Sequence, residues 1–275
     1  MAADAPGAPG WTRRRLLKWA AGGGLALASG ALGVEGNCLH VERLQVDRFG
    51  FRRRLRLGLL ADLHAPRFSF DLDRLKAAIN AEGCDLVVSV GDLIEEASSV
   101  GLVEGLLSGL EAPLGRFAVL GNWEHWGRVD LRALALAHAR AGFELLINAR
   151  VEVPWEGAVV SIVGLDDMLD GSPRWPLVAE RPDDPALILS HCPASAEAIV
   201  AHRPDPALIL SGHTHGGQIA PLGWAIWTPP GSGDFVRGRY EVGDKATMLV
   251  SPGLGNSVIP FRTGSPPTLM IVDVL

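Results

Sequence analysis

Two histidines separated by one residue, His213 and His215, are suited to bind one metal ion together. They follow an apolar run at residues 207–210, which is typical of a buried strand, and glycines flank them on both sides. These glycines allow the backbone to turn, so that both imidazoles can point at one place. A histidine pair alone does not define a site, and further ligands must come from elsewhere in the chain.

Four other apolar runs also end in residues of metal-binding type, and each run again has the character of a buried strand. The residues that follow these runs are, in chain order, Asp62 with His64, then Asp92, Asn122 and His191. Period-two spacing puts Asp62 and His64 on one side of an extended segment. Because open sheets collect ligands at the carboxyl ends of their strands, we expect all these side chains to meet at one sheet edge.

The mixture of carboxylate, amide and imidazole donors indicates which ions the site would hold. Such a set suits zinc, manganese or iron rather than a thiolate zinc site. Seven candidate ligands are too many for one ion and match two ions if one carboxylate bridges them. Two-metal sites, with ions roughly 3.5–4 Å apart, clamp a phosphoryl group and lower the pKa of bound water from 15.7 toward about 7.

The elements that must position these residues follow from hydrophobic periodicity. The runs that precede the candidate ligands are predicted strands at residues 55–61, 85–90, 116–120, 186–189 and 207–210. Further strands are predicted at residues 41–46, 144–147, 151–155, 158–163, 224–227, 236–242, 247–250 and 268–272. Helices are predicted at residues 72–81, 99–110, 130–141 and 194–201, although Gly101, Gly105 and Gly109 weaken the second.

The five motifs, in this order, resemble those of the calcineurin-like metallophosphoesterases, across roughly residues 55–273. The form Gly-His-Thr-His-Gly-Gly-Gln at residues 212–218 is similar to the bacterial branch that contains twin-arginine-exported phosphoesterases. The resemblance implies an α/β (α+β) fold in which two mixed β-sheets pack as a sandwich with flanking helices, a four-layer αββα arrangement. It also implies a phosphoester hydrolase with two divalent metal ions (Mn, Zn or Fe).

The resemblance further implies a role for each ligand. One metal would be held by Asp62, His64 and His215, and the other by Asn122, His191 and His213. Asp92 would bridge the two ions, together with the hydroxide that attacks phosphorus in line. No covalent enzyme intermediate is then required.

One position departs from the family pattern. The family has a histidine after the Gly-Asn pair, where this chain has Trp123, and the nearest imidazole is His125. On a tight loop His125 could reach back over the site, so the predicted catalytic residues are His125, Asp92 and Asn122. The alternative is that His125 is a surface loop residue. Trp123 and Trp126 would then form an apolar wall suited to a lipid-like or aromatic leaving group, or only pack the loop.

The remaining polar candidates receive weaker interpretations. A place on the rim of the site is open to Asp166 and Asp167, but a turn role is favoured, and a solvated role is favoured for Arg67 and Arg237. No function is assigned to His40, His138 and His202.

The N-terminus has the layout of an export signal. Basic residues at 12–18 precede an uncharged run at residues 19–34, which is shorter than the roughly 20 residues of a spanning helix. The paired arginines resemble a twin-arginine signal, which predicts a partner in the twin-arginine export machinery. Residues 1–35 are therefore expected to be a signal peptide or an anchor, and residues 36–275 a single domain. The expected location is the periplasm or the outer face of the cytoplasmic membrane; the alternative is a basic start of a cytoplasmic protein.

Composition and net charge exclude one class of binding partner. The chain has 275 residues, 48% of them hydrophobic, and a net charge of −6, which argues against nucleic-acid binding. Its three cysteines encode no disulfide framework.

Three functions are compatible with these observations. The first is a dinuclear phosphoester hydrolase exported to the cell envelope. A membrane-surface pyrophosphatase or phosphodiesterase of nucleotide-linked or lipid substrates is the second, favoured by Trp123, Trp126, Trp224 and Trp227 and by a retained anchor. The third, a metal-binding scaffold without catalysis, is favoured by the missing family histidine.

Overall fold

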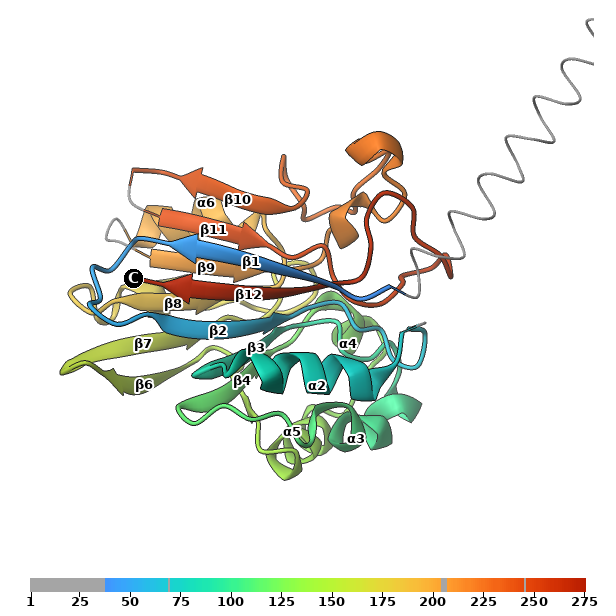
Figure 1. Ribbon diagram of the computed structural model, residues 1–275, viewed down its shortest axis with the longest axis horizontal. Coiled ribbons are helices and arrows are strands. Elements are labelled where there is room, and N and C mark those ends of the chain that lie inside the picture. Colours follow the sequence, from blue (N-terminus) through green and yellow to red (C-terminus); the bar gives the residue numbers. More distant parts are fainter. Residues whose placement is uncertain (1–37, 69, 204–206, 245) are drawn as a thin grey trace, which may run out of the picture.

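The computed structural model of the protein describes residues 38–68, 70–203, 207–244 and 246–275 (Figure 1). The predicted signal or anchor at residues 1–35 lies outside these residues. Within the part of the chain that is described, no helix combines the length and the apolar character needed to cross a bilayer.

The first of two sheets has six strands in the order β1-β12-β2-β3-β4-β5. Its strands are β1 (His40–Val46), β2 (Leu55–Leu60), β3 (Leu86–Val90), β4 (Gly115–Val119), β5 (Glu144–Leu145) and β12 (Thr268–Val274). β2 to β5 run parallel to one another, whereas β12 is antiparallel to β2 and parallel to β1. The last strand of the described residues thus lies between the first two strands described.

The second sheet also has six strands, in the order β10-β11-β9-β8-β7-β6. Its strands are β6 (Ala149–Trp155), β7 (Ala158–Gly164), β8 (Ala186–Leu189), β9 (Ala207–Ser211), β10 (Gly238–Val242) and β11 (Ala246–Val250). The four inner strands are parallel and the two outer strands are antiparallel to their neighbours. Both sheets are therefore mixed, as expected.

The two sheets pack face to face through one apolar core. Leu57 and Leu59 of β2 point into this core with Val88 of β3, and Leu187 and Leu208 enter it from the second sheet. The alternate residues of the same strands point outward, because successive side chains of a strand face opposite ways. Burial of each such leucine contributes roughly 1.5–3 kcal/mol to stability.

Helices cover the outer faces of both sheets (Figure 1). The helices are α2 (Leu72–Glu82), α3 (Val103–Leu107), α4 (Asn122–Trp126), α5 (Leu131–Arg140) and α6 (Ser195–His202). Helix α2 begins where Asp71 caps two backbone N–H groups and ends at Gly83, which is left-handed with φ of 61°. Apolar residues of α2, α3 and α5 pack on the first sheet, and those of α6 pack on the second. The predicted four-layer arrangement is confirmed.

Several predicted elements differ from those observed. Residues 224–227 do not form a strand; they lie in a loop that ends in Pro229 and Pro230, which cannot donate to a ladder. The expected helix at residues 99–110 is a 3₁₀ turn (Ala97–Leu102) followed by α3, and it stops before Gly109, which has φ of 81°. The expected loop after Gly121 is helix α4, too short for periodicity to reveal.

Candidate metal centre

The predicted ligands do converge, but at the edges of two sheets rather than one. Asp62 follows β2, and its backbone N–H donates to Gly91 O after β3 (3.1 Å). His213 follows β9 of the other sheet, and its backbone N–H donates to Asp62 Oδ1 (2.8 Å). This bond joins the two sheets directly beneath the site.

The backbone at the centre is held in an unusual conformation. Among the seven predicted ligands, the left-handed ones are Asp62 (φ 52°), His64 (51°), Asp92 (52°), His213 (73°) and His215 (53°). Each such residue other than glycine costs of order 1–3 kcal/mol, and this conformation concentrates at functional sites. This left-handed conformation directs the side chains away from the strands that precede them and toward a common centre.

The first cluster contains His64, His215 and Asp62, all buried. Nε2 of His64 and Nε2 of His215 face each other at 2.9 Å, and Asp62 Oδ1 lies 3.9 Å from the latter. The other ring nitrogen of His64 contacts Glu95 Oε1 at 3.1 Å. A carboxylate oxygen accepts the Nδ1 proton there, so Nε2 is the nitrogen left to bind an ion.

The second cluster contains His191, His213 and Asn122. His191 Nε2 lies 3.1 Å from His213 Nδ1 and 3.1 Å from Asn122 Oδ1. The opposite nitrogens donate to carbonyl oxygens, His191 Nδ1 to Val90 O (2.7 Å) and His213 Nε2 to Pro230 O (2.7 Å). Because a carbonyl can only accept, these bonds leave one lone pair of each ring directed at the centre.

Asp92 contacts both clusters. Its Oδ2 lies 3.1 Å from Nε2 of His191 and 3.7 Å from Nε2 of His64. Its Oδ1 accepts the backbone N–H of Trp123 (3.0 Å), which fixes the carboxylate plane. The position suits the predicted bridging role.

Electrostatics favour a cation at this centre. Burial raises the pKa of Asp92, but the charge and the hydrogen bond of His191, together with the charges of His64 and His213, outweigh burial and lower this pKa to about 2. Burial lowers the pKa of His191, yet Asp92 outweighs it and raises the pKa to about 10. Burial raises the pKa of Asp62 to about 6. Two carboxylates, four imidazoles and an amide oxygen, all buried, form a donor set that fits divalent ions.

Comparison with known proteins identifies the family. A profile described as Calcineurin-like phosphoesterase matches residues 55–217, which is more than half of the chain. The chain belongs to the calcineurin-like phosphoesterase family. Members of the family use divalent metals, and the clustered carboxylate and imidazole side chains of this chain are candidate ligands for them.

Three relatives show how far the likeness extends. The chain is 28% identical to an uncharacterized metallophosphoesterase, Cj0846, of Campylobacter jejuni over 85% of this chain, but spans only 63% of that protein. It is 29% identical to the uncharacterized metallophosphoesterase YkuE of Bacillus subtilis, over 94% of this chain and 96% of that one. It is 28% identical to phosphodiesterase YaeI of Escherichia coli, over 78% of this chain and 80% of that one.

Two glycines of the phosphoesterase motifs are required by close approach. A Cβ at Gly121 would lie 2.2 Å from Asp92 Oδ1, and one at Gly212 would lie 2.7 Å from Asp62 Oδ2. Any larger residue would displace the carboxylate beside it. The motif spacing therefore includes glycine for a steric reason.

Three residues that support the phosphoesterase site were not assigned a role from the sequence. Glu124 is buried and its two oxygens accept four backbone N–H groups around Asp92. Glu95 holds His64 and also pairs with Arg67 Nη1 (2.8 Å). Arg262 is fully buried and donates to backbone oxygens, while its Nη2 lies 3.2 Å from His215 Nδ1. Glu124 lies inside a motif, but nothing in the pattern pointed to Glu95 or Arg262.

His125 does not join the ligand cluster. Its Nε2 contacts Asp166 Oδ1 at 2.9 Å, and this hydrogen bond raises the pKa of His125 despite partial burial. Asp166 also accepts N–H groups of Asp167 and Ser172, which confirms a turn role for it. Asp167 likewise accepts from Leu169 N and Asp170 N.

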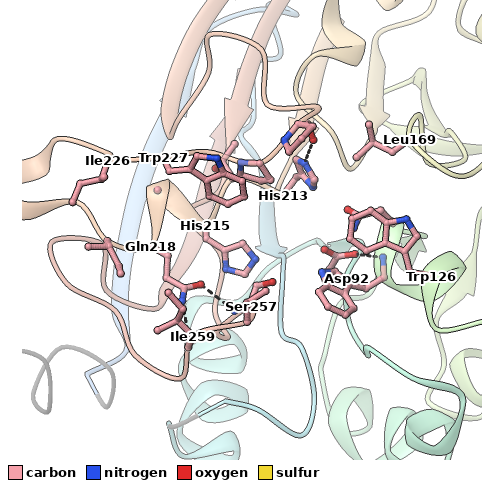
Figure 2. A pocket seen from close by; sticks show the side chains of 18 of the residues that line it. Asp92, Trp126, Leu169, His213, His215, Gln218, Ile226, Trp227, Ser257 and Ile259 are labelled. Atoms are coloured by element: carbon pink, nitrogen blue, oxygen red, sulfur yellow. Dashed lines mark hydrogen bonds between the residues drawn. The ribbon is translucent and has the colours of Figure 1, made fainter.

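A cavity of about 600 Å³ opens beside the metal centre (Figure 2). Asp92, His213 and His215 form its polar floor. Its walls are mainly apolar and are formed by Trp123, Trp126, Leu169, Ile219, Ile226, Trp227, Pro229, Pro230, Val258 and Ile259. Among the described residues that line this cavity, α4 supplies Asn122 and both tryptophans but not His125.

Proposed function

We propose that the chain is a dinuclear phosphoester hydrolase that acts in the cell envelope on phosphodiesters with an apolar or nucleotide-like substituent. The observation that carries the proposal is the pair of nitrogen contacts, His64 with His215 and His191 with His213, with Asp92 between them. Each contact would correspond to one metal position. The two ions are drawn from manganese, zinc and iron, which suit this donor set.

Each residue of the centre has a proposed role. Asp62, His64 and His215 would hold one ion, Asn122, His191 and His213 the other, and Asp92 both. When bound, the ions would polarise the phosphoryl oxygens and supply a water of lowered pKa for in-line attack. Glu95, Val90 and Pro230 fix the ring orientations through hydrogen bonds, and the apolar cavity walls exclude bulk water.

The substrate class follows from the cavity. The phosphate would lie at the polar floor, formed by Asp92, His213 and His215, and the substituent would lie against Trp123 and Trp126, which line the same cavity. Aromatic faces accept either a nucleobase or an aliphatic chain. The name of the Escherichia coli relative, a phosphodiesterase, supports a diester rather than a monoester.

The proposed proton donor to the leaving group is His125, which lies on α4, the helix that also carries Asn122. To act, its ring would turn from Asp166 toward the cavity. We expect His125→Ala to slow hydrolysis of an alkyl phosphodiester by about 10²–10⁴-fold. An activated nitrophenyl ester needs no proton donor, so its rate is expected to change little. Equal losses on both esters would indicate a structural role, and unchanged rates would dismiss His125 from catalysis.

Metal add-back tests the dinuclear proposal. Metal-stripped protein is titrated with Mn²⁺ or Zn²⁺ while bound metal per chain, thermal midpoint and phosphodiester hydrolysis are recorded. We expect two ions per chain, and stabilisation of about 2.7 kcal/mol when free metal is 100-fold above Kd. Because His191 must lose a proton to bind a metal, and its pKa is raised to about 10, the metal affinity should decrease as the pH is lowered. Tight metal binding without turnover would instead establish a non-catalytic scaffold.

Envelope location is proposed from the basic residues at 12–18 and the uncharged run at 19–34. Twin-arginine export carries the chain, and residues 19–34 keep it at the outer face of the cytoplasmic membrane if they are not removed. Cell fractionation tests this proposal, and a full-length protein confined to the cytosol would contradict it.

A further inference from the structure

Exposed apolar side chains surround the mouth of the cavity. Six of the ten large apolar side chains that are exposed in the described part of the chain lie on two loops there, at residues 219–237 and 251–266. We call these six the apolar rim: Leu222, Trp224, Ile226, Trp227, Val258 and Ile259. Such a concentration marks an interaction surface, because isolated exposed residues would be scattered.

The backbone holds the rim outward. Leu222 is 98% exposed and Val258 is 76% exposed, and both are left-handed, with φ of 56° and 60°. This conformation is rare for a bulky or β-branched residue, and asparagine or glycine would adopt it more easily. Strain and full exposure of an apolar side chain both oppose stability, so this arrangement serves contact with another surface.

The rim carries no charge. Residues 219–233 and 251–261 contain no Asp, Glu, Lys or Arg, although 20% of the chain is charged. Asp234 and Arg237 follow the first of these segments, but the six rim side chains themselves offer a charged peptide or a nucleic acid no complementary group. The surface that fits is neutral and apolar, and tryptophans at its border suit the interface between lipid and water.

The chain outside the structure joins the fold beside the rim. The described chain begins at Cys38, and His40 N donates to Pro267 O (2.8 Å), at the end of the second rim loop. Thr268 N in turn donates to Gly253 O (3.0 Å) within that loop. The uncharged residues 19–34 therefore precede a strand that starts at this edge of the sheet (Figure 1). If residues 19–34 insert into a bilayer, the apolar rim lies close to that bilayer.

We propose that the apolar rim docks on a lipid bilayer and that the cavity receives the apolar part of an amphiphilic phosphoester drawn from it. Figure 2 shows Ile226 and Ile259 on one side of the cavity and Trp126 on the other, with His215 and Asp92 between them. A substrate entering past the rim thus meets the metal centre with its phosphate. The inference rests on the proposed hydrolase function.

The test compares one reaction in two settings. Full-length, metal-loaded protein hydrolyses hexadecyl p-nitrophenyl phosphate in phosphatidylcholine vesicles and, separately, soluble bis(p-nitrophenyl) phosphate. The rim variant is Leu222→Asp with Trp224→Asp, neither of which lines the cavity. The matched control is Leu102→Asp with Leu136→Asp, two exposed leucines on other elements.

We expect the rim variant to lower the ratio of vesicle rate to soluble rate by about tenfold or more, because Asp is costly to bring into lipid. The control should keep the ratio of the unmodified protein. That ratio should also be insensitive to salt, since the rim is uncharged. Equal ratios for the rim variant and the control would overturn the proposal.

Two further outcomes are separable. If the unmodified, metal-loaded protein fails to hydrolyse the soluble ester, the proposed function fails rather than the docking inference. Sedimentation without vesicles tests a second copy as the occupant. A dimer that the rim variant dissociates, with the rate ratio unchanged, would assign the rim to self-association and overturn lipid docking.

Discussion

Asp92→Asn is expected to reduce metal-dependent hydrolysis by about 10³-fold or more. Asp92 Oδ2 lies 3.1 Å from Nε2 of His191 and 3.7 Å from Nε2 of His64, which belong to different clusters. An amide lacks the negative charge that holds two cations close together. Loss of several kcal/mol of transition-state stabilisation corresponds to this factor at 1.36 kcal/mol per tenfold change in rate.

The measurement is kcat/KM on an activated phosphodiester with saturating Mn²⁺ or Zn²⁺, together with bound metal per chain. Asparagine keeps the shape of the side chain, including an oxygen that can accept the Trp123 N–H. Asp183→Asn, at an exposed site, removes the same charge elsewhere. An Asp92 variant with an unchanged rate and two bound ions would refute the bridging role.

Glu124→Ala is expected to lower the free energy of unfolding by about 3–5 kcal/mol, a cost typical of breaking a buried charged network. The Glu124 oxygens accept N–H groups of Gly121 (2.8 Å), Asp92 (3.2 Å), Leu93 (2.7 Å) and Ile94 (3.2 Å). Alanine leaves these buried donors without an acceptor, and each unpaired donor costs about 1–3 kcal/mol before water or rearrangement relieves it.

Urea unfolding of the metal-free protein measures this loss without the added effect of metal binding. Glu124→Gln keeps one acceptor oxygen, so its free energy of unfolding should lie between those of the unmodified chain and of Glu124→Ala. Glu96→Ala, at an exposed position nearby, is the matched control and should lie within about 0.5 kcal/mol of the unmodified chain. A similarly small change in Glu124→Ala would show that the network is not a stabilising element.

The convergence of the candidate ligands could be predicted because each of them follows a short buried strand. Apolar runs ending in Asp62 or His191 fix both the element and the position of the side chain just beyond it. The division into two sheets could not be derived from the same runs. β3 and β8 are equally buried, and only pairing between distant segments decides which sheet each one joins.

Other parts of the site depend on contacts that leave no periodic signal. Arg262 is buried because carbonyls of Pro252, Gly255 and Ser265 surround it, and those come from an irregular loop. The short helix α4 directs Trp123 toward the cavity and His125 toward Asp166, and a five-residue helix shows no repeat. The role of His125 stays a prediction.

The place of β12 between β1 and β2 has a consequence for synthesis. In the described sheet β1 pairs with β12 alone, through partners such as His40 and Thr268, so the two ends of the described chain must meet. The emerging polypeptide therefore cannot complete its first sheet while the ribosome still holds Thr268–Val274. The proposed export of folded chains would then have to follow translation of this strand.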